Sequence, residues 1–177
     1  MWLRVIIRHG CPIWQIRRDY KMKIKWVKAG TLMFLAAYLV FLCTRGWAKD
    51  VPIEEMASKM EQDKTITSLE KCGARQLRRF YGLEAGNLEG YVFYKAESPM
   101  SVDEFLVVKA ESPKEAEDVL DSAEKHLEEQ KKSFEGYGVS QTALLTEAAV
   151  ESRGSYVLYA SGSHAQQWRK EFLELIK

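Results

Sequence analysis

The chain has 177 residues, 46% of them hydrophobic, and a formal net charge of +1. The charge is unevenly distributed, because residues 1–44 contain eight Lys and Arg and a single acid, whereas the rest contains 18 Lys and Arg and 24 acids. The near-neutral total therefore combines a basic N-terminal part with an acidic remainder. No GxSxG, HExxH, CxxC, P-loop or GxGxxG motif occurs, which excludes the enzyme classes that these motifs define.

Residues 26–47 predict one membrane-spanning helix. The uncharged run within them, residues 29–44, is 16 residues long, and Trp26 and Trp47 are 21 residues apart. At about 1.5 Å per residue this separation is roughly 31 Å, close to the thickness of the hydrocarbon core of a bilayer. Each indole would then lie at a membrane interface, where tryptophan is enriched. We therefore expect a single-pass protein that contacts the lipid bilayer.

The charges that flank this segment predict its orientation. Eight Lys and Arg precede the uncharged run, residues 29–44, whereas Arg45 and Lys49 follow it closely. Because cationic flanks resist translocation, residues 1–25 should form a basic cytoplasmic tail, and residues 49–177 an extracytoplasmic domain at the cell membrane. Nucleic acid is not an expected partner, since the folded domain is acidic and lies outside the cell.

Two processed forms are alternatives to a permanent anchor. A chain that starts at Met22 would begin like a signal peptide, and residues 46–48 offer small residues at the positions that a signal peptidase inspects. Cleavage near Ala48 would then release a secreted domain, and residues 1–21 would not belong to the protein. A lipoprotein site at Cys43 is disfavoured, because the bulky Leu42 precedes it.

Two helices are predicted at the start of the exported domain. In the first, residues 51–60, the apolar side chains on one face are Ile53, Met56, Ala57 and Met60. In the second, residues 69–83, they are Leu69, Cys72, Leu77 and Phe80, so Cys72 should be buried. The second helix also carries a basic patch, formed by Lys71, Arg75, Arg78 and Arg79. Such a patch suits structural ion pairs, or contact with an anionic envelope polymer or lipid headgroups.

The hydrophobic period then changes from helical to strand-like. Residues 90–95 and 104–109, separated by a turn-rich stretch, are predicted to form a hairpin. Ser112 and Glu115 form a capping box that opens a long amphipathic helix, and Gly136 is placed to end it.

The pattern recurs in outline after this helix. A short helical turn at residues 142–147 precedes a second predicted hairpin of residues 148–151 and 155–160, and residues 163–166 form a capping box that opens a last helix. The sequence therefore predicts an α+β domain with an antiparallel four-stranded sheet in β-β-α-β-β-α order, preceded by two helices.

Both faces of this predicted sheet are apolar. An antiparallel sheet commonly leaves one face to water, so something must cover the second. The N-terminal helices are one candidate. The other is a partner or ligand, which would then bind a surface that carries Tyr91, Tyr94, Tyr156 and Tyr159.

Four stretches of the sequence resemble a known family. They are YGLEAGNLEGYVFYKAE, EFLVVKAESPKEAEDVL, HLEEQKKSFEGYG and AAVESRGSYVLYASG. Together they resemble a bacterial domain of unknown function, the family numbered four-three-five-eight, over roughly residues 51–177. The resemblance implies an extracytoplasmic cell-envelope protein of a Gram-positive lineage and implies no activity. The chain departs from the lipoprotein form common in the family, because no small residue precedes Cys43.

Residues suited to catalysis are few. His126 lies in a charged helix, and His164 beside Ser163 is the nearest approach to a Ser/His pair, but adjacent residues at a helix start rarely face each other. No catalytic, cofactor-binding or metal-binding residue is therefore predicted. We expect a membrane-tethered binding or interaction module, with another envelope protein or a second copy as partner. The alternatives are an envelope hydrolase with an unrecognised site and a regulatory or assembly subunit of a membrane complex.

Overall fold

The computed structural model describes residues 27–28, 30–39 and 48–177, and the chain divides into two compact units, Met1–Arg45 and Gly46–Lys177. In the first unit, residues 27–28 and 30–39 are helical. Across the described ranges, no helix combines the length and the apolar character that crossing a membrane requires. The predicted tail, residues 1–25, and the rest of the segment 26–47 lie outside the described residues.

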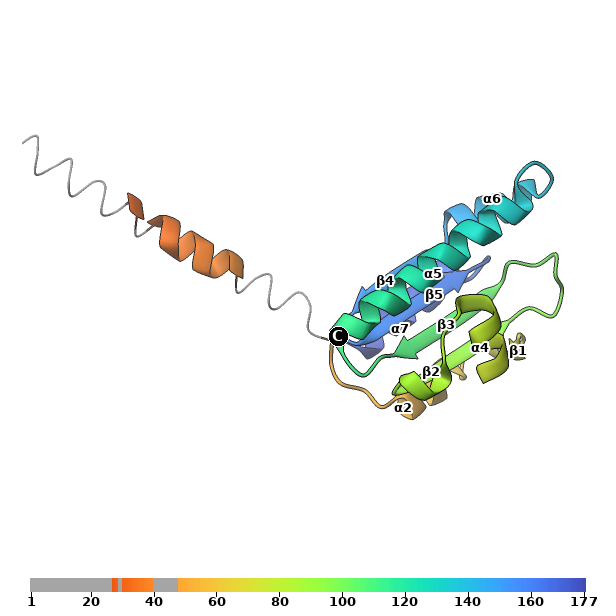
Figure 1. Cartoon of the computed structure of the whole chain (residues 1–177), viewed down its shortest axis with the longest axis horizontal. Helices are drawn as coiled ribbons and strands as arrows, with labels where there is room; N and C mark the ends of the chain where they lie inside the picture. The colour runs from red at the N-terminus through yellow and green to blue at the C-terminus, as the bar shows by residue number, and fades with distance from the viewer. Residues whose placement is uncertain (1–26, 29, 40–47) are drawn as a thin grey trace, which may run out of the picture. The chain divides into compact units, whose positions relative to one another are not determined.

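The second unit is built around an antiparallel sheet with helices on both of its faces (Figure 1). Its five strands are β1 (Glu70–Lys71), β2 (Gly90–Lys95), β3 (Glu104–Lys109), β4 (Ala149–Arg153) and β5 (Tyr156–Ser161). The spatial order is β1-β2-β3-β5-β4, and all neighbours are antiparallel. The predicted α+β class and the predicted antiparallel sheet are thus confirmed.

The sheet has one strand more than predicted. Residues 70–71, which the helical spacing assigned to the second N-terminal helix, instead pair with β2, where Lys71 lies opposite Tyr94. The N–H of Cys72 continues this pairing by donating to the carbonyl of Phe93 over 2.9 Å. The helix, α4 (Ala74–Tyr81), begins only after Gly73. The prediction of four strands was wrong because a two-residue strand has no periodicity, and only its partner strand defines it.

Helices cover both apolar faces. One face packs against α2 (Ile53–Met60), α3 (Lys64–Thr67) and α7 (Ala165–Leu175), and the other against α4 and α5 (Pro113–Phe134). The short 3₁₀-helix η1 (Ala85–Asn87) follows α4, and α6 (Val139–Thr146) follows α5. The second face therefore needs no partner to bury it, although α4, one of the two predicted N-terminal helices, lies with α5 rather than with α2.

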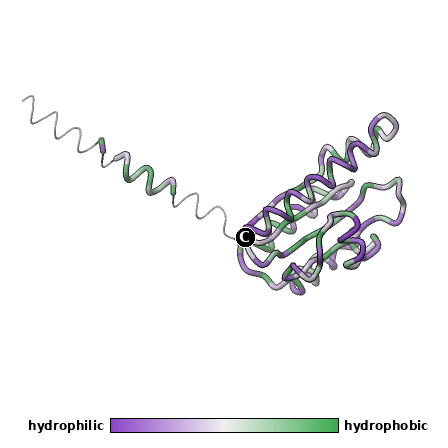
Figure 2. The backbone as a smooth tube through the Cα atoms, in the orientation of Figure 1, coloured by the Kyte–Doolittle hydropathy of each residue, from purple (hydrophilic) through white to green (hydrophobic). Residues whose placement is uncertain are grey.

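The two-residue period of the strands produces these two cores. Phe105 and Val107 of β3 point into the core that contains Trp168, whereas Leu106 and Val108 point into the core beside α4 and α5. Figure 2 shows the consequence in hydropathy, with hydrophobic residues along the central strands and mixed hydropathy along α5. All six residues of β3 are buried. The predicted alternation of side chains is confirmed.

The two predicted capping boxes differ in outcome. At α5, the Ser112 hydroxyl accepts a hydrogen bond from the N–H of Glu115 over 3.2 Å, which is the serine half of the predicted box. At α7 no side chain caps the helix, and the N-cap residue is His164. The N–H of Ser163 instead donates to the carboxylate of Asp103, and the amide of Gln166 donates to the Glu147 carbonyl. The second capping box was wrong because tertiary partners compete for the same groups.

The two ends of β3 carry buried charges with different surroundings. Lys109 lies beside Asp50, with a 2.7 Å ion pair, and also pairs with Glu89. This end of the sheet holds the start of the domain, since the Val51 N–H donates to the Tyr156 hydroxyl over 2.8 Å. Glu104 lies at the other end of β3, five residues from Lys109, which is about 17 Å at 3.4 Å per residue. A cleft opens at that second end.

Candidate ligand-binding cleft

A cleft of about 560 Å³ opens on the face of the sheet that carries α4 and α5. One wall is α4, the other is the C-terminal half of α5, and the end of β2 with the loop after it, residues 96–101, completes the lining. Its volume lies in the range of small-molecule sites. The polar side chains that line it are Glu70, Gln76, Arg79, Lys95, Glu97, Ser98, Ser101, His126, Glu129, Gln130 and Ser133.

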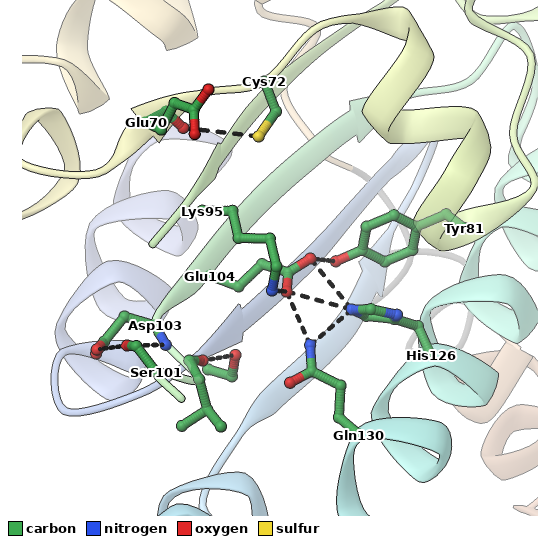
Figure 3. A network of polar contacts seen from close by, with 11 residues as sticks. Glu70, Cys72, Tyr81, Lys95, Ser101, Asp103, Glu104, His126 and Gln130 are labelled. Carbon is green, nitrogen blue, oxygen red and sulfur yellow. Dashed lines mark hydrogen bonds and ion pairs between the residues drawn. The ribbon is translucent and has the colours of Figure 1, made fainter. Parts of the chain in front are cut away.

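Beneath this cleft lies Glu104, whose side chain is completely buried. It is the first residue of β3 and lies directly opposite Lys95 of β2, whose ammonium donates to Glu104 Oε2 over 2.6 Å. The hydroxyl of Tyr81, at the end of α4, donates to Glu104 Oε1 over 2.7 Å (Figure 3). The carboxylate therefore joins the sheet to α4 and fixes the Lys95 ammonium at the cleft.

Two residues of α5 complete this network. His126 and Gln130 are four residues apart, so they lie on one face of the helix. The Nε2 of His126 is 3.2 Å from the Glu104 carboxylate, and the Nε2 of Gln130 is 2.8 Å from Glu104 Oε2 and 2.8 Å from His126 Nε2 (Figure 3). Gln130 can donate to His126 Nε2 only while that nitrogen carries no proton. The Nε2 of His126 therefore either donates to Glu104 or accepts from Gln130, but not both at once.

The charges of this network determine its ionisation. Burial raises the pKa of Glu104, but the hydrogen bond from His126 and the charges of His126 and Lys95 outweigh it and lower the pKa to about 2. Burial and the nearby Glu104 charge raise the pKa of Tyr81 and of Tyr159. Glu104 is thus a permanent anion at neutral pH, and Tyr81 remains a neutral donor to it.

Aromatic rings surround the polar network. The ring of His126 lies 4.4 Å from that of Tyr81 and 5.4 Å from that of Tyr159, measured between centroids. The Tyr159 hydroxyl is buried and has no hydrogen-bond partner of normal geometry among the described residues, although Ser161 lies near enough to lower its pKa. Next to the cleft, the Lys95 ammonium lies 5.3 Å from the centre of the Phe80 ring, within the range of a cation–π contact.

The structure places the four tyrosines of the predicted interaction surface in different surroundings. Tyr94, Tyr156 and Tyr159 are at most 5% exposed, and Tyr91 is half-buried. Tyr156 bonds to the start of the domain, and the Tyr94 hydroxyl donates to Glu61 over 2.6 Å. The first three therefore pack inside the domain and present no surface to a partner, because helices cover both faces of the sheet.

The four cations of the predicted basic patch are all exposed but do not share one environment. Lys71, on β1 rather than on the helix, pairs with Glu61 over 2.8 Å, and Arg78 pairs with Glu84 over 2.9 Å. Arg79 lines the cleft, with its guanidinium 5.4 Å from the centre of the Phe80 ring. Arg75 lies one turn before it on α4. The patch thus divides into two paired cations and two at the edge of the cleft.

The groups suited to nucleophilic chemistry do not meet a base. Cys72 is free and buried, as its spacing predicted, and its thiol donates to the Glu70 carbonyl over 3.7 Å. Burial and the neighbouring Glu70 raise its pKa, which disfavours the reactive thiolate. His164 contacts Trp168 rather than the hydroxyl of Ser163. Over residues 27–28, 30–39 and 48–177, no group of three His, Cys, Asp or Glu could hold a metal ion.

Sequence reasoning missed the residues that form this site. Glu104, Lys95, His126 and Gln130 come from three elements, and their separation in the chain hides their contact. One signal was present: Glu104 begins a strand whose next four residues are apolar, and a charge beside a buried strand needs a buried partner. The partner could not be identified, because several cations in the domain were candidates.

The fold and the site define the molecule as an antiparallel α+β domain with a polar cleft over a buried ionic network. Residues 62–162 match the family model described as Domain of unknown function (DUF4358). The chain belongs to this family, as its sequence resemblance predicted. No curated protein and no solved structure matches the chain.

Proposed function

We propose that this protein is a membrane-tethered extracytoplasmic binding module whose ligand occupies the cleft above Glu104. The observation that carries the proposal is the buried network of Glu104, Lys95, His126 and Gln130 beneath a cleft of about 560 Å³. Buried ion pairs contribute little net stability compared with well-packed apolar residues, so stability alone does not account for this one. Polar groups that converge on a concave site are typical of ligand binding.

Binding is favoured over catalysis, because the network contains no free general base and no nucleophile. Glu104 has four hydrogen-bonding neighbours, and its lowered pKa makes it a poor general base. Among the described residues, no hydroxyl or thiol of a serine, threonine or cysteine is hydrogen-bonded to His126. The network therefore holds the side chains of Lys95, His126 and Gln130 in fixed positions, where a ligand can bind them.

The tether is part of the proposal and rests on the sequence. The apolar segment 26–47 and its basic N-terminal flank support a single span with the domain outside, and the family resemblance agrees with an envelope location. A ligand of the cell envelope or the surrounding medium would then reach the cleft without crossing the membrane.

A photo-crosslinking experiment tests the cleft. Benzoylphenylalanine in place of Tyr137, which is exposed and lines the cleft, should capture a ligand when the full chain is irradiated in intact cells. The same group in place of Glu54, exposed on α2 against the opposite face of the sheet, is the matched control. Mass spectrometry of the purified adducts should give a species specific to position 137.

A second variant separates the cleft from the nearby surface. Ser133→Trp places a large side chain in the cleft at an exposed helix position, so it should abolish the position-137 adduct without unfolding the domain. Equal adducts at positions 54 and 137, or an adduct that persists in a folded Ser133→Trp variant, would contradict the proposal.

A further inference from the structure

Arg75 and Arg79 form an exposed cationic pair at the α4 edge of the cleft. They are one helical turn apart on α4, and together with Gln76 they line a hollow of about 480 Å³. Gln76 and Arg79 also line the cleft, so the hollow adjoins it. A ligand in the cleft can therefore extend over this pair.

These two arginines differ from the other cations of the same segment. Lys71 and Arg78 are neutralised by Glu61 and Glu84, whereas neither Arg75 nor Arg79 has an ion pair within residues 48–177. The stability of α4 does not explain Arg75, because it lies in the first turn, where the helix dipole disfavours a cation. The contact of Arg79 with Phe80 holds its guanidinium beside the cleft. An anionic group from outside the domain could therefore form ion pairs with both arginines.

The remaining charges of the cleft restrict which anion could bind. The Lys95 ammonium is occupied by Glu104, and three further carboxylates line the cleft, those of Glu70, Glu97 and Glu129. Glu129 has only a distant partner, Lys125, at 4.0 Å. A polyanion that filled the cleft would meet these carboxylates, whereas a single anionic group bound to Arg75 and Arg79 would occupy the adjoining hollow, which carries no carboxylate in its lining. The arrangement therefore selects a ligand with one localised negative charge.

We propose that the ligand of the cleft carries one anionic group, a carboxylate or a phosphate, which Arg75 and Arg79 bind while the rest of the ligand lies in the cleft against Phe80. This inference rests on the proposed function and specifies the chemistry of its ligand. Guanidinium groups suit both anions, because their planar N–H donors match pairs of anionic oxygens.

Arginine-selective modification of the full chain in detergent tests the pair directly. Phenylglyoxal labels accessible guanidinium groups, and peptide mass spectrometry reports the rate at each arginine. Phenyl phosphate and benzoate, which carry a phosphate and a carboxylate, are the probes, with inorganic phosphate and phenol as comparators. At a probe concentration five times its dissociation constant, modification of Arg75 and Arg79 should slow about sixfold. Arg78, in the same segment, should be unaffected and is the internal control.

Three results would overturn the inference. They are no protection by phenyl phosphate or by benzoate, equal protection of Arg78, and protection by inorganic phosphate at the same concentration as phenyl phosphate, which would show that the cleft contributes nothing. If phenol protected Arg75 and Arg79 as well as phenyl phosphate does, the anionic group would not contribute to binding, and the inference would also fail.

The ligand adduct at position 137, measured in arginine variants, distinguishes failure of this inference from failure of the proposed function. The double variant Arg75→Ala/Arg79→Ala should lose the adduct, Arg78→Ala should retain it, and the variant with lysine at positions 75 and 79 should retain part of it. Undiminished capture by a folded double alanine variant would reject the anionic group and leave the ligand cleft standing. Capture that survives Ser133→Trp would reject the cleft itself.

Discussion

At the scale of single residues, the molecule depends on a charge buried at the start of a strand. Glu104 is compensated by Lys95 across the sheet, by Tyr81 from α4 and by the two polar residues of α5. Removing one partner of such a group leaves an unpaired buried charge, which costs more than the network contributes. We therefore expect the contributions of these side chains to stability to be coupled, because each bond to Glu104 requires its charged carboxylate.

The lowered pKa of Glu104 predicts an acid-sensitive component of stability. Its pKa is about 2 in the folded protein against an ordinary value of 4.5, so this component is fully present above pH 4.5 and is lost as the pH falls towards 2. Between pH 6 and pH 3 the loss should be about 2 kcal/mol. Urea unfolding followed by tryptophan fluorescence measures it.

The isosteric variant Glu104→Gln isolates this component, because other carboxylates of the domain also titrate in the same range. The difference in unfolding free energy between the wild-type protein and the variant should shrink by about 2 kcal/mol on going from pH 6 to pH 3. A difference that does not change with pH would show that the network does not lower the pKa of Glu104.

At the scale of elements, the junction between β5 and α7 determines where the loop after β2 lies. Gly162 follows β5 with a φ of 101°, and a Cβ on it would lie 2.1 Å from Asp103 Oδ1 and 2.8 Å from the Asp103 Cα. On the other side of this contact, Asp103 accepts from Ser101, which lines the cleft. The close approach of these two backbones therefore supports one end of the cleft.

Gly162→Ala should be strongly destabilising for this reason. The left-handed backbone and the clash with the Asp103 backbone together should cost about 2–4 kcal/mol of unfolding free energy. Gly82→Ala is the matched control, because Gly82 has a φ of 70° but open space around it, and it should cost only about 1 kcal/mol. Equal losses in urea unfolding would show that the approach to Asp103 is not tight.

At the scale of the whole molecule, the proposal places the folded domain outside the cell and the N-terminal tail inside. Residues 49–51 are bound to the far end of the sheet through Ile176, Tyr156 and Lys109, so the domain begins almost directly after the segment 26–47. The Glu104 end of β3, and the cleft with it, lies about 17 Å along the strand from this attachment. The cleft therefore lies at the end of β3 opposite to the one that binds residues 49–51.

Thiol labelling tests this topology. Ser98→Cys introduces an exposed thiol in the loop that lines the cleft, and a membrane-impermeant maleimide should label it in intact cells. Cys11 should react only after the cells are permeabilised, and the buried Cys72 only after the domain is unfolded. Labelling of the introduced cysteine only in permeabilised cells would place the domain in the cytoplasm.

Four features were predictable before the fold was known, because neighbouring residues encode them: the α+β class, the alternation of side chains along β2, β3 and β5, the long helix from Ser112, and the family. Three features became visible only in the folded domain: residues 70–71 form a strand, Tyr94, Tyr156 and Tyr159 are interior, and Glu104 meets Lys95, His126 and Gln130. These depend on side chains 9 to 26 residues from Glu104, or on a partner strand, and local periodicity carries no record of such contacts.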